Sequence, residues 1–352
     1  MRYTLLGAAA AAAIAVVLIQ QLKPTVADDR ARPTADQPRA EFVLDLPYGT
    51  GQGCVGSTRA HEPDKSAPPM CPEMFQMTAD GTLWVLDTVN SRVLSFKDGS
   101  QTAEISTLGF RKSPALFGVT GGAVFVARTA GDNGPVGLLL RCARGSSARE
   151  TVRLELADGT RFLPLRVMPL GAEGNALLLN GTRTSPEAGA SAVVDDSGSV
   201  TRLVQDDRCI PAPDGSVWRL RAIEDSQPSE VTFALEKYNT QTQVWDIRAQ
   251  GSLPRRAELY AQRKRPNLRP IGVDQEGGAV AVLLEGKPLS PRFIRVTPTG
   301  AVAAAVTLED LGFDSKPLTR HFATEHYQLL ADGSVLAQYA TPERYRIIRI
   351  HM

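Results

Sequence analysis

Short apolar segments alternate with polar turns along this chain, and the clearest example begins at Phe75. An apolar stretch leads into Asp80-Gly81, and a second covers Thr82–Leu86. A polar turn follows, and the third apolar stretch then covers Arg92–Phe96. Short apolar runs bounded by Asp-Gly pairs are typical of strands joined by hairpins, because glycine accepts the positive φ that such turns require. The pattern therefore predicts an all-β chain.

The same turn-and-strand outline recurs along the sequence at irregular intervals. Its turn glycines are Gly81, Gly122, Gly174, Gly215, Gly278 and Gly333. A small unit repeated in this way cannot bury its apolar face alone, so neighbouring copies must pack together. Six turns predict a six-bladed β-propeller over residues 41–352. The alternatives are a two-sheet sandwich and a seven-bladed ring with one blade missed.

The last predicted blade has only three strands. One strand-like segment near the start of the chain belongs to none of the predicted blades. The chain stops shortly after the strand at Tyr345–Ile350, whereas Glu41–Leu46 alternates apolar and polar residues ahead of the first repeat. Pairing these two segments would remove two sheet edges at once. We therefore expect the N-terminal strand to complete the last blade and close the ring.

The N-terminal residues resemble a targeting segment rather than part of the fold. A short basic start precedes an uncharged apolar run at Leu5–Ile19, and small residues follow at Thr25–Ala27. This order predicts that residues 1–27 are a signal peptide or an N-terminal membrane anchor. Residues 28–40 are polar and Pro-containing, which predicts a flexible linker. We expect a periplasmic or secreted protein, with the anchor as its one contact with a membrane.

The overall charge gives no global attraction to any class of partner. The 39 basic residues nearly balance the 38 acidic ones, for a net charge of +1. Nucleic-acid binding is therefore not expected, because it depends on a basic surface. One basic insertion, Arg255–Pro270, is a candidate contact surface for an acidic partner. The propeller is expected to act as a monomer or as part of a complex.

Four cysteines fit an oxidising compartment. Cys54 and Cys71 flank a loop rich in Pro, Ser and charge, and we predict a disulfide between them. Cys142 and Cys209 fall in different blades of the predicted ring. A disulfide needs Cα atoms within about 7 Å, which residues of separate blades do not readily reach. For Cys142 and Cys209 the alternatives are therefore a disulfide and two buried thiols.

The first repeat carries a side-chain motif as well as a turn. Asp87 ends one strand, Asn90 lies in the following turn, and Arg92 begins the next strand. In this motif the repeat resembles the NHL type of six-bladed propeller. Asp and Asn can cap a tight turn through bonds to the backbone, and the arginine can pair with the aspartate. The resemblance implies a fold-making role for the three residues.

Enzymes on related propellers supply the alternative function. Gluconolactonase-type propellers hold a divalent metal in the channel, and Glu73 lies near the position of that family's glutamate. Lyases of another group use several histidines, of which this chain has four. We expect no metal site, no cofactor and no catalytic residue. The alternative function is a metal-dependent lactonase- or lyase-like enzyme, which would bind a divalent cation. The glycines at Gly51, Gly53 and Gly56 precede a Pro-rich stretch rather than a helix, which predicts a loop instead of a nucleotide site.

In a propeller the innermost strands line the axis, and the loops that enter them surround one mouth of the channel. Counting back from the turn glycines gives charged residues of both signs at these entry positions. The predicted binding residues are Glu73, Arg166, Arg208, Arg269, Glu325 and His326. Such a mouth suits polar or charged groups of a ligand. We therefore expect a binding or scaffold protein that recognises an extracytoplasmic protein, peptide or glycan.

Overall fold

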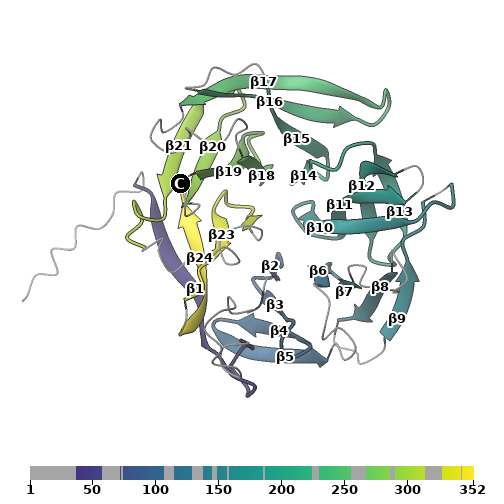
Figure 1. Cartoon of the computed structure of the whole chain (residues 1–352), viewed down its shortest axis with the longest axis vertical. Helices are drawn as coiled ribbons and strands as arrows, with labels where there is room; N and C mark the ends of the chain where they lie inside the picture. Colours follow the sequence, from purple (N-terminus) through teal and green to yellow (C-terminus); the bar gives the residue numbers. More distant parts are fainter. Residues whose placement is uncertain are drawn as a thin grey trace, which may run out of the picture. The chain divides into compact units, whose positions relative to one another are not determined.

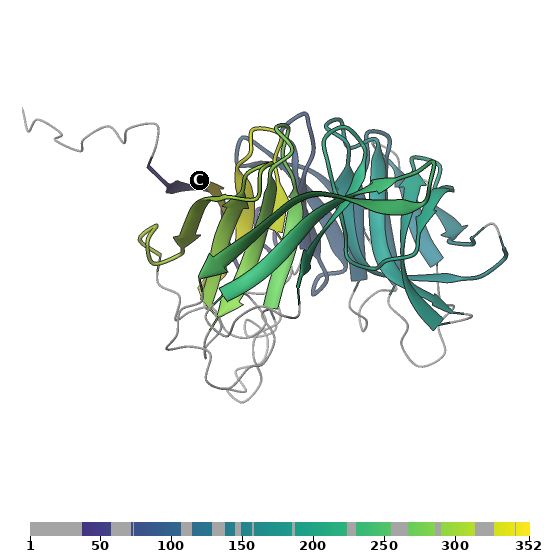
Figure 2. The ribbon, with the colours of Figure 1, turned by 90° about the horizontal axis from the view of Figure 1, so that it is seen from above.

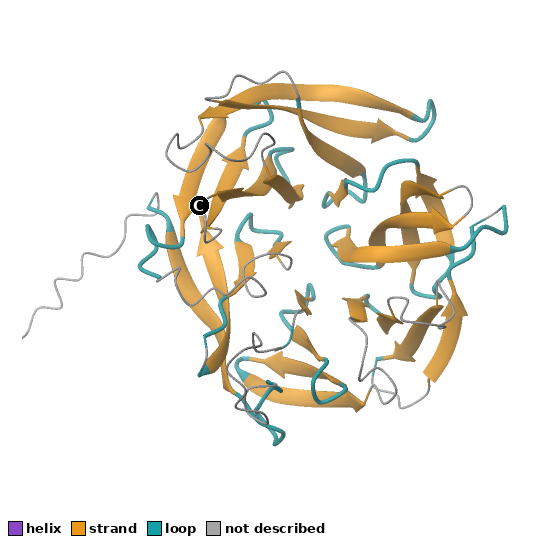
Figure 3. Ribbon diagram, in the orientation of Figure 1, coloured by secondary structure: helices purple, strands orange, loops and turns teal. Residues whose placement is uncertain are grey.

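The structure is a computed structural model in which every regular element of the described residues is a β-strand (Figure 3). It describes residues 37–57, 72, 74–106, 115–128, 138–144, 149–156, 158–184, 187–223, 230–254, 267–285, 290–313, 327–341 and 343–352. Within these ranges there is no helix long and apolar enough to span a membrane.

Residues Pro38–Met352 form one compact unit of six four-stranded sheets arranged as a ring, a β-propeller (Figure 1). The innermost strands are β2 (Met74–Met77), β6 (Ala115–Val119), β10 (Phe162–Leu170), β14 (Cys209–Pro211), β18 (Asn267–Val273) and β22 (Tyr327–Leu329). The second strands are β3 (Leu83–Asp87), β7 (Ala123–Arg128), β11 (Ala176–Thr184), β15 (Val217–Ala222), β19 (Ala279–Glu285) and β23 (Val335–Gln338). The third strands are β4 (Arg92–Lys97), β8 (Leu138–Ala143), β12 (Glu187–Asp195), β16 (Glu230–Asn239), β20 (Ser290–Val296) and β24 (Arg344–His351). The outer strands are β5 (Ser100–Ser106), β9 (Arg149–Arg153), β13 (Val200–Val204), β17 (Val244–Pro254), β21 (Val302–Thr307) and β1 (Arg39–Pro47).

The predicted six-bladed ring is confirmed, with every expected hairpin at its expected turn. All pairings within a blade are antiparallel, and the strands run steeply between the two faces of the ring (Figure 2). The longest of the described strands is β17, which runs from Val244 to Pro254. The two alternative folds, a sandwich and a seven-bladed ring, are wrong.

Ring closure is also confirmed. β1 pairs with β24 from Arg39 opposite His351 to Pro47 opposite Arg344, with a bulge between Phe42 and Leu44. Its inward residues Leu44 and Leu46 are buried and share one apolar core with side chains from the first, fifth and sixth blades. The chain thus joins its first and last strands in one sheet.

The charged side chain of Asp45 adds polar contacts to this closing pair of strands. Its carboxylate bonds Arg344 and lies 3.2 Å from Nε of Arg346. On the outward side the Arg346 guanidinium lies over the ring of Phe42, which in turn packs edge-on against Phe313. Both faces of the closing strand are therefore held by its neighbours.

The motif of the first repeat ties the chain after β1 to the first blade. Asp87 is fully buried, and its Oδ1 accepts hydrogen bonds from the backbone N–H of Gly56 at 3.0 Å and of Asn90 at 3.3 Å. Its Oδ2 accepts from the Asn90 amide and from Nε of Arg92. The Asn90 amide also donates to the carbonyl of Gly49. The predicted fold-making role of these residues is confirmed.

Arg92 completes the same contact from its other nitrogen atoms. Nη2 donates to the carbonyls of Gly51 and Cys54, and Nη1 pairs with Glu104. One buried Asp–Arg pair thus anchors the described part of the loop after β1, from Gly49 to Gly56, to the first blade. The three glycines of the nucleotide-site pattern belong to this anchored loop, as expected.

The cysteines that the structure describes form no disulfide. Cys54, Cys142 and Cys209 are free cysteines in the structure, and Cys71 lies outside the described residues. The predicted Cys54–Cys71 disulfide thus has no support here. For the other pair, the alternative of two buried thiols is the correct one: burial raises the pKa of both, to about 12 for Cys209, so both are protonated at neutral pH.

The anchored loop leads to a prediction at Gly56. A Cβ added there would lie 2.5 Å from the Cβ of Val89 and 2.8 Å from Oδ1 of Asp87, whereas one added at Gly51 meets nothing within 4 Å. We expect Gly56→Ala to lower the free energy of unfolding by about 2 kcal/mol through overpacking. Gly51→Ala is the matched control and should change it by less than about 0.5 kcal/mol. Urea unfolding of the two variants compares them, and equal stabilities would contradict the role of the loop.

The hairpin aspartates have pKa values below their usual range. A hydrogen bond from the Thr78 hydroxyl, together with a backbone bond from Thr82 and the Arg144 guanidinium, lowers the pKa of Asp80 far below 3.8. At Asp332 burial acts to raise the pKa, but bonds from Ser334 and Arg349 outweigh it and lower it. A carboxyl with a lowered folded-state pKa stabilises the fold above its unfolded pKa and loses that contribution as the pH falls through the folded-state value.

We therefore expect the melting temperature to fall steeply as the pH drops below about 4. Asp80→Asn removes one titrating group but keeps an acceptor oxygen. It should be less stable than the wild type at neutral pH and lose less stability between about pH 5 and about pH 2. Asp98→Asn, in the exposed turn between β4 and β5, is the control. Differential scanning calorimetry across this range measures the melting temperature of each variant. If the wild type and Asp80→Asn lose the same stability, Asp80 does not make the proposed contribution.

Candidate functional site

The innermost strands of three neighbouring blades are joined by glutamine side chains. Gln76 in β2 donates to the carbonyl of Val119 in β6 at 2.6 Å and accepts from the N–H of the same residue at 2.8 Å. Gln328 in β22 makes the equivalent pair of bonds to the backbone of Met77 in β2, both 2.7 Å long. Each amide therefore replaces a missing backbone partner between blades. These bonds hold one side of the central channel in a fixed geometry.

The channel encloses a cavity of about 390 Å³ lined by all six innermost strands or the turns beside them. Most of its wall is apolar, with Met74, Met77, Met168, Phe117, Ile271 and Leu329 among the lining residues. Ligand pockets are commonly concave, mostly apolar and of roughly 300–1,000 Å³. The cavity is thus large enough for a few apolar side chains or a small ligand.

The cavity reaches the surface at the hairpin end of the channel. Its lining includes the turn residues Ala79, Gly81, Ala172 and Ala331, all of which are exposed. These small residues leave space for a narrow group to enter. The described opening is therefore opposite the predicted mouth, because that mouth was placed where the chain enters each innermost strand.

Arg166 lies at the inner end of this cavity. The register of β10 shifts between Pro164 and Arg166, so that Leu165 is an extra residue and is 55% exposed. A bulge of this kind redirects the following side chain. Nη2 of Arg166 donates to the carbonyl of Pro270 in β18 at 3.0 Å, reaching past β14, which lies between the two strands in the ring. One of the predicted binding residues thus lines the cavity and spans part of the channel.

Arg269, the neighbour of Pro270 in β18, is the second predicted residue at this end. It does not line the cavity, but its charge acts on the phenol of Tyr327, which does. Burial raises the pKa of Tyr327, and the positive charge of Arg269 opposes part of that rise. The ring of Tyr327 packs edge-on against Phe293 at 5.5 Å. Facing strands therefore bring Arg166 and Arg269 to the same end of the channel.

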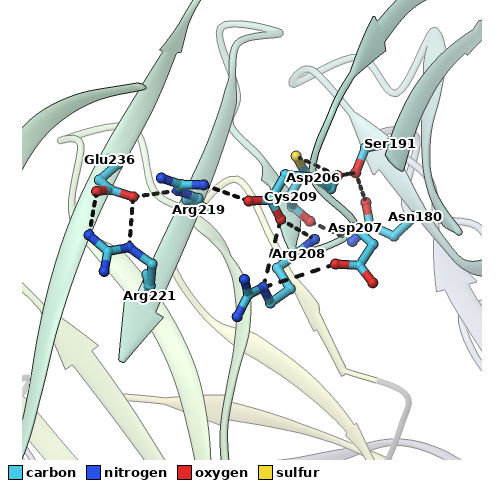
Figure 4. Close-up of polar contacts among 9 residues, drawn as sticks. All are labelled: Asn180, Ser191, Asp206, Asp207, Arg208, Cys209, Arg219, Arg221 and Glu236. Atoms are coloured by element: carbon cyan, nitrogen blue, oxygen red, sulfur yellow. Dashed lines mark hydrogen bonds and ion pairs between the residues drawn. The ribbon is translucent and has the colours of Figure 1, made fainter. Parts of the chain in front are cut away.

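Arg208 is the third predicted residue that the structure describes, and it lies elsewhere. Its side chain is 69% exposed just before β14, within 4.0 Å of Asp206 and Asp207. Figure 4 shows it beside a polar network that the sequence did not reveal. The other predicted binding residues, Glu73, Glu325 and His326, lie outside the described residues, as does most of the basic insertion Arg255–Pro270.

The network beside Arg208 is a chain of alternating charges inside the fourth blade. Asp206 accepts a bond from Arg219 at 2.6 Å, Arg219 bonds Glu236, and Glu236 bonds Arg221 at 3.0 Å (Figure 4). Arg219 also lies over the ring of Trp245, 4.3 Å from its centroid. Burial alone would raise the pKa of Glu236, but the two guanidinium groups outweigh it and lower the pKa.

A second part of the network joins the third blade to the fourth. The amide of Asn180 donates to the carbonyl of Cys209, and its oxygen accepts from the hydroxyl of Ser191, both at 2.7 Å. The Ser191 hydroxyl is also within bonding distance of the Asp206 carbonyl. All these groups are paired with protein atoms, so the network is best explained as structural. A short run of alternating charges across two strands, Arg219 and Arg221 opposite Glu236, is the signal that could have found it.

The part of the chain that the structure describes holds no group of three or more His, Cys, Asp or Glu side chains placed to bind a metal ion. Three charged residues are among those lining the cavity, namely Arg166, Asp332 and Arg349. Asp332 is bonded by Arg349 and by the Ser334 hydroxyl. The Ser334 hydroxyl itself is buried and is not among the residues that line the cavity.

Comparisons with known proteins do not show a family for this chain. No family model and no curated protein matches the chain. Solved structures that resemble it include a virginiamycin B lyase from Staphylococcus aureus, at 13% identity and a TM-score of 0.44 over 90% of this chain and 100% of that one. A streptogramin B lyase matches at 13% identity and 0.42 over 82% and 84%. A putative TolB from Agrobacterium tumefaciens matches at 10% and 0.42 over 90% and 99%. Similarity this low carries no argument about function.

The charge network gives a testable contrast between two carboxylates. Glu236→Gln leaves two arginines facing one neutral amide in a buried setting, and we expect it to lower the free energy of unfolding by about 3 kcal/mol. The control is Glu150→Gln, which breaks a pair with Arg141 in which the glutamate is 65% exposed. That change should cost less than about 1 kcal/mol. Urea unfolding decides between them, and a cost at Glu236 no larger than at Glu150 would refute a structural role for the network.

Proposed function

We propose that this protein is an extracytoplasmic six-bladed propeller that binds a peptide segment of a partner protein inside its central channel. The observation that carries the proposal is the apolar cavity of about 390 Å³ that reaches the surface at the hairpin end. Export is supported by the N-terminal sequence, in which a basic start, an apolar run and small residues follow one another.

The chemistry of the cavity wall favours a peptide over a glycan. Sugars are recognised by many hydrogen-bonding groups, whereas this wall consists mainly of methionine, aliphatic and aromatic side chains. The two amides in it, Gln76 and Gln328, use both their oxygen and nitrogen atoms to join the inner strands. Methionine side chains adapt their shape to different apolar groups, which suits the binding of side chains of more than one kind.

The size and rigidity of the cavity point the same way. About 390 Å³ holds the end of a chain or a few side chains, not a whole domain. Hydrogen bonds between the inner strands keep the cavity open without a ligand, so little ordering entropy is lost on binding. No observation on the described residues favours the alternative of a metal-dependent lactonase or lyase.

The experiment blocks the opening of the cavity without changing its inner wall. A library of random seven-residue peptides, displayed with free C-termini, is selected on the wild-type protein, and the recovered peptides are labelled at their N-termini. We expect them to bind the wild type and to lose at least about ten-fold in affinity for Ala172→Trp, because the indole fills the opening. Ala331→Trp narrows the opening from another blade and should act in the same way.

The matched control is Ala301→Trp. Ala301 is also an exposed alanine in a hairpin turn, but it does not line the cavity. Fluorescence polarisation gives the affinities, and melting temperatures show whether each variant folds. Failure to recover any peptide, or equal affinities for the wild type and Ala172→Trp, would overturn the proposal.

A further inference from the structure

We infer that the peptide bound in the cavity carries lysine or arginine beside its apolar residues, and that these basic side chains contact acidic residues around the opening. This inference rests on the proposed function, since it specifies the chemistry of the same partner. It is carried by the apolar cavity together with the charges of the turns at its open end.

The open end of the channel is formed by the turns that join each innermost strand to the second strand of its blade. These rim turns are residues 78–82, 120–123, 171–175, 212–216, 274–278 and 330–334. All of them lie within the described residues. None contains Lys, Arg or His, whereas all except 120–123 contain an Asp or a Glu. The rim turns themselves therefore contribute only negative charge to the opening.

Basic side chains at the ends of the third strands offset part of this charge. Each aspartate of the rim turns has one such partner: Asp80 pairs with Arg144, Asp214 with Lys237, Asp274 with Arg295 and Asp332 with Arg349. The two charges of each pair compensate one another at a distance. The character of the opening is therefore set by the acidic residues that these pairs leave over.

Two exposed glutamates of the rim turns are left over in this way. Glu173 lies between Ala172 and Gly174, which both line the cavity, and it forms no ion pair with the residues that the structure describes. Glu276 is 79% exposed and lies 3.8 Å from Arg295, whose closer partner is Asp274 at 2.9 Å. One arginine thus faces two carboxylates, and the rim carries excess negative charge.

A third carboxylate lies beside the one rim turn that has no acid of its own. A Cβ added at Gly122 would lie 3.2 Å from Oδ2 of Asp196, which belongs to the turn between β12 and β13. Oδ1 of Asp196 is buried and has no hydrogen-bond partner. Arg141 donates to the backbone carbonyl of Asp196, while its guanidinium pairs with Glu150. Asp196 therefore keeps an acceptor oxygen that a donor from a ligand could satisfy.

A basic group beside an apolar segment fits this arrangement. The apolar residues enter the cavity, and a lysine or arginine next to them stays at the rim, where its long stem reaches the carboxylates. The acidic turns are also held in place, because the N–H of Ala172 donates to the carbonyl of Pro213 at 2.9 Å and joins two neighbouring rim turns. The whole chain has a net charge of +1, so its total charge does not attract a cation. A preference for basic peptides would therefore come from the rim.

The test compares peptides that differ only in the charge beside their apolar residues. Each probe joins three apolar residues, in all combinations of Leu, Val, Phe and Met, to two lysines in one pool and to two glutamates in the other. The apolar residues form either the N-terminal or the C-terminal end, both ends are blocked, and a Gly-Ser linker on the charged side attaches the peptide to a biosensor. We expect the lysine pool to bind the wild type at least about ten-fold more tightly at about 0.05 M sodium chloride, and this ratio to shrink at about 0.5 M.

Variants assign the preference to the rim. Glu173→Gln combined with Glu276→Gln should lower the ratio at least about three-fold, and Glu173→Lys combined with Glu276→Lys should abolish or reverse it. Both positions are exposed, so these variants should fold. Glu155→Gln combined with Glu309→Gln is the matched control. Both are exposed glutamates that follow outer strands, at the opposite end of the ring, and neither lines the cavity. This control should leave the ratio unchanged.

The outcomes separate this inference from the proposed function. If both pools bind equally and both are blocked by Ala172→Trp, the cavity binds peptides but the inference about charge is wrong. If lysine is preferred and the lysine substitutions at Glu173 and Glu276 keep the full ratio, the basic residues bind elsewhere and the inference is again wrong. If Ala172→Trp leaves binding of the lysine pool unchanged, or if neither pool binds, the proposed function is overturned together with the inference.

Discussion

The structure depends on the closure of its ring, where a strand from the beginning of the sequence completes the sheet at the end. A propeller with an unpaired β24 would expose the edge of its last sheet, and β1 without that sheet would have no partner for its backbone groups. The buried Asp87–Arg92 pair adds a second constraint, because it anchors the loop after β1 to the first blade. The two ends of the ring are thereby linked by main-chain pairing on one side and by a buried ion pair on the other.

The geometry of the channel follows from that closure. Once the blades are held in a ring, their innermost strands face one another, and polar groups on them must find partners across the gaps between blades. Gln76 and Gln328 satisfy the backbone of the neighbouring strand, and Arg166 reaches a carbonyl two blades away. The cavity is therefore bounded by paired groups and apolar side chains, and its shape is set by the fold.

The regular features of the sequence were enough to predict the fold. The repeated turn glycines gave the number of blades, the strand-like Glu41–Leu46 gave the closure, and Asp87, Asn90 and Arg92 were correctly assigned to the fold. Side chains that act between repeats could not be placed in this way. The bonds of Gln76 and the chain of charges around Glu236 depend on the distance between strands of different hairpins, which local pattern does not contain. Even so, both glutamines occupy the same place relative to their turn glycines, and this coincidence was available before the structure.

The pairing of β1 with β24 has a consequence for how the molecule forms. Asp45 and Arg344 meet across this sheet although 299 positions separate them in the chain. Contacts this distant require the intervening polypeptide to be present before they can form, and such high contact order slows folding. During synthesis the early strand must wait, unpaired, until the final segment has left the ribosome. A chain exported as proposed here would complete its fold only after its last residues have crossed the membrane. The arrival of that final segment would then set when the ring closes.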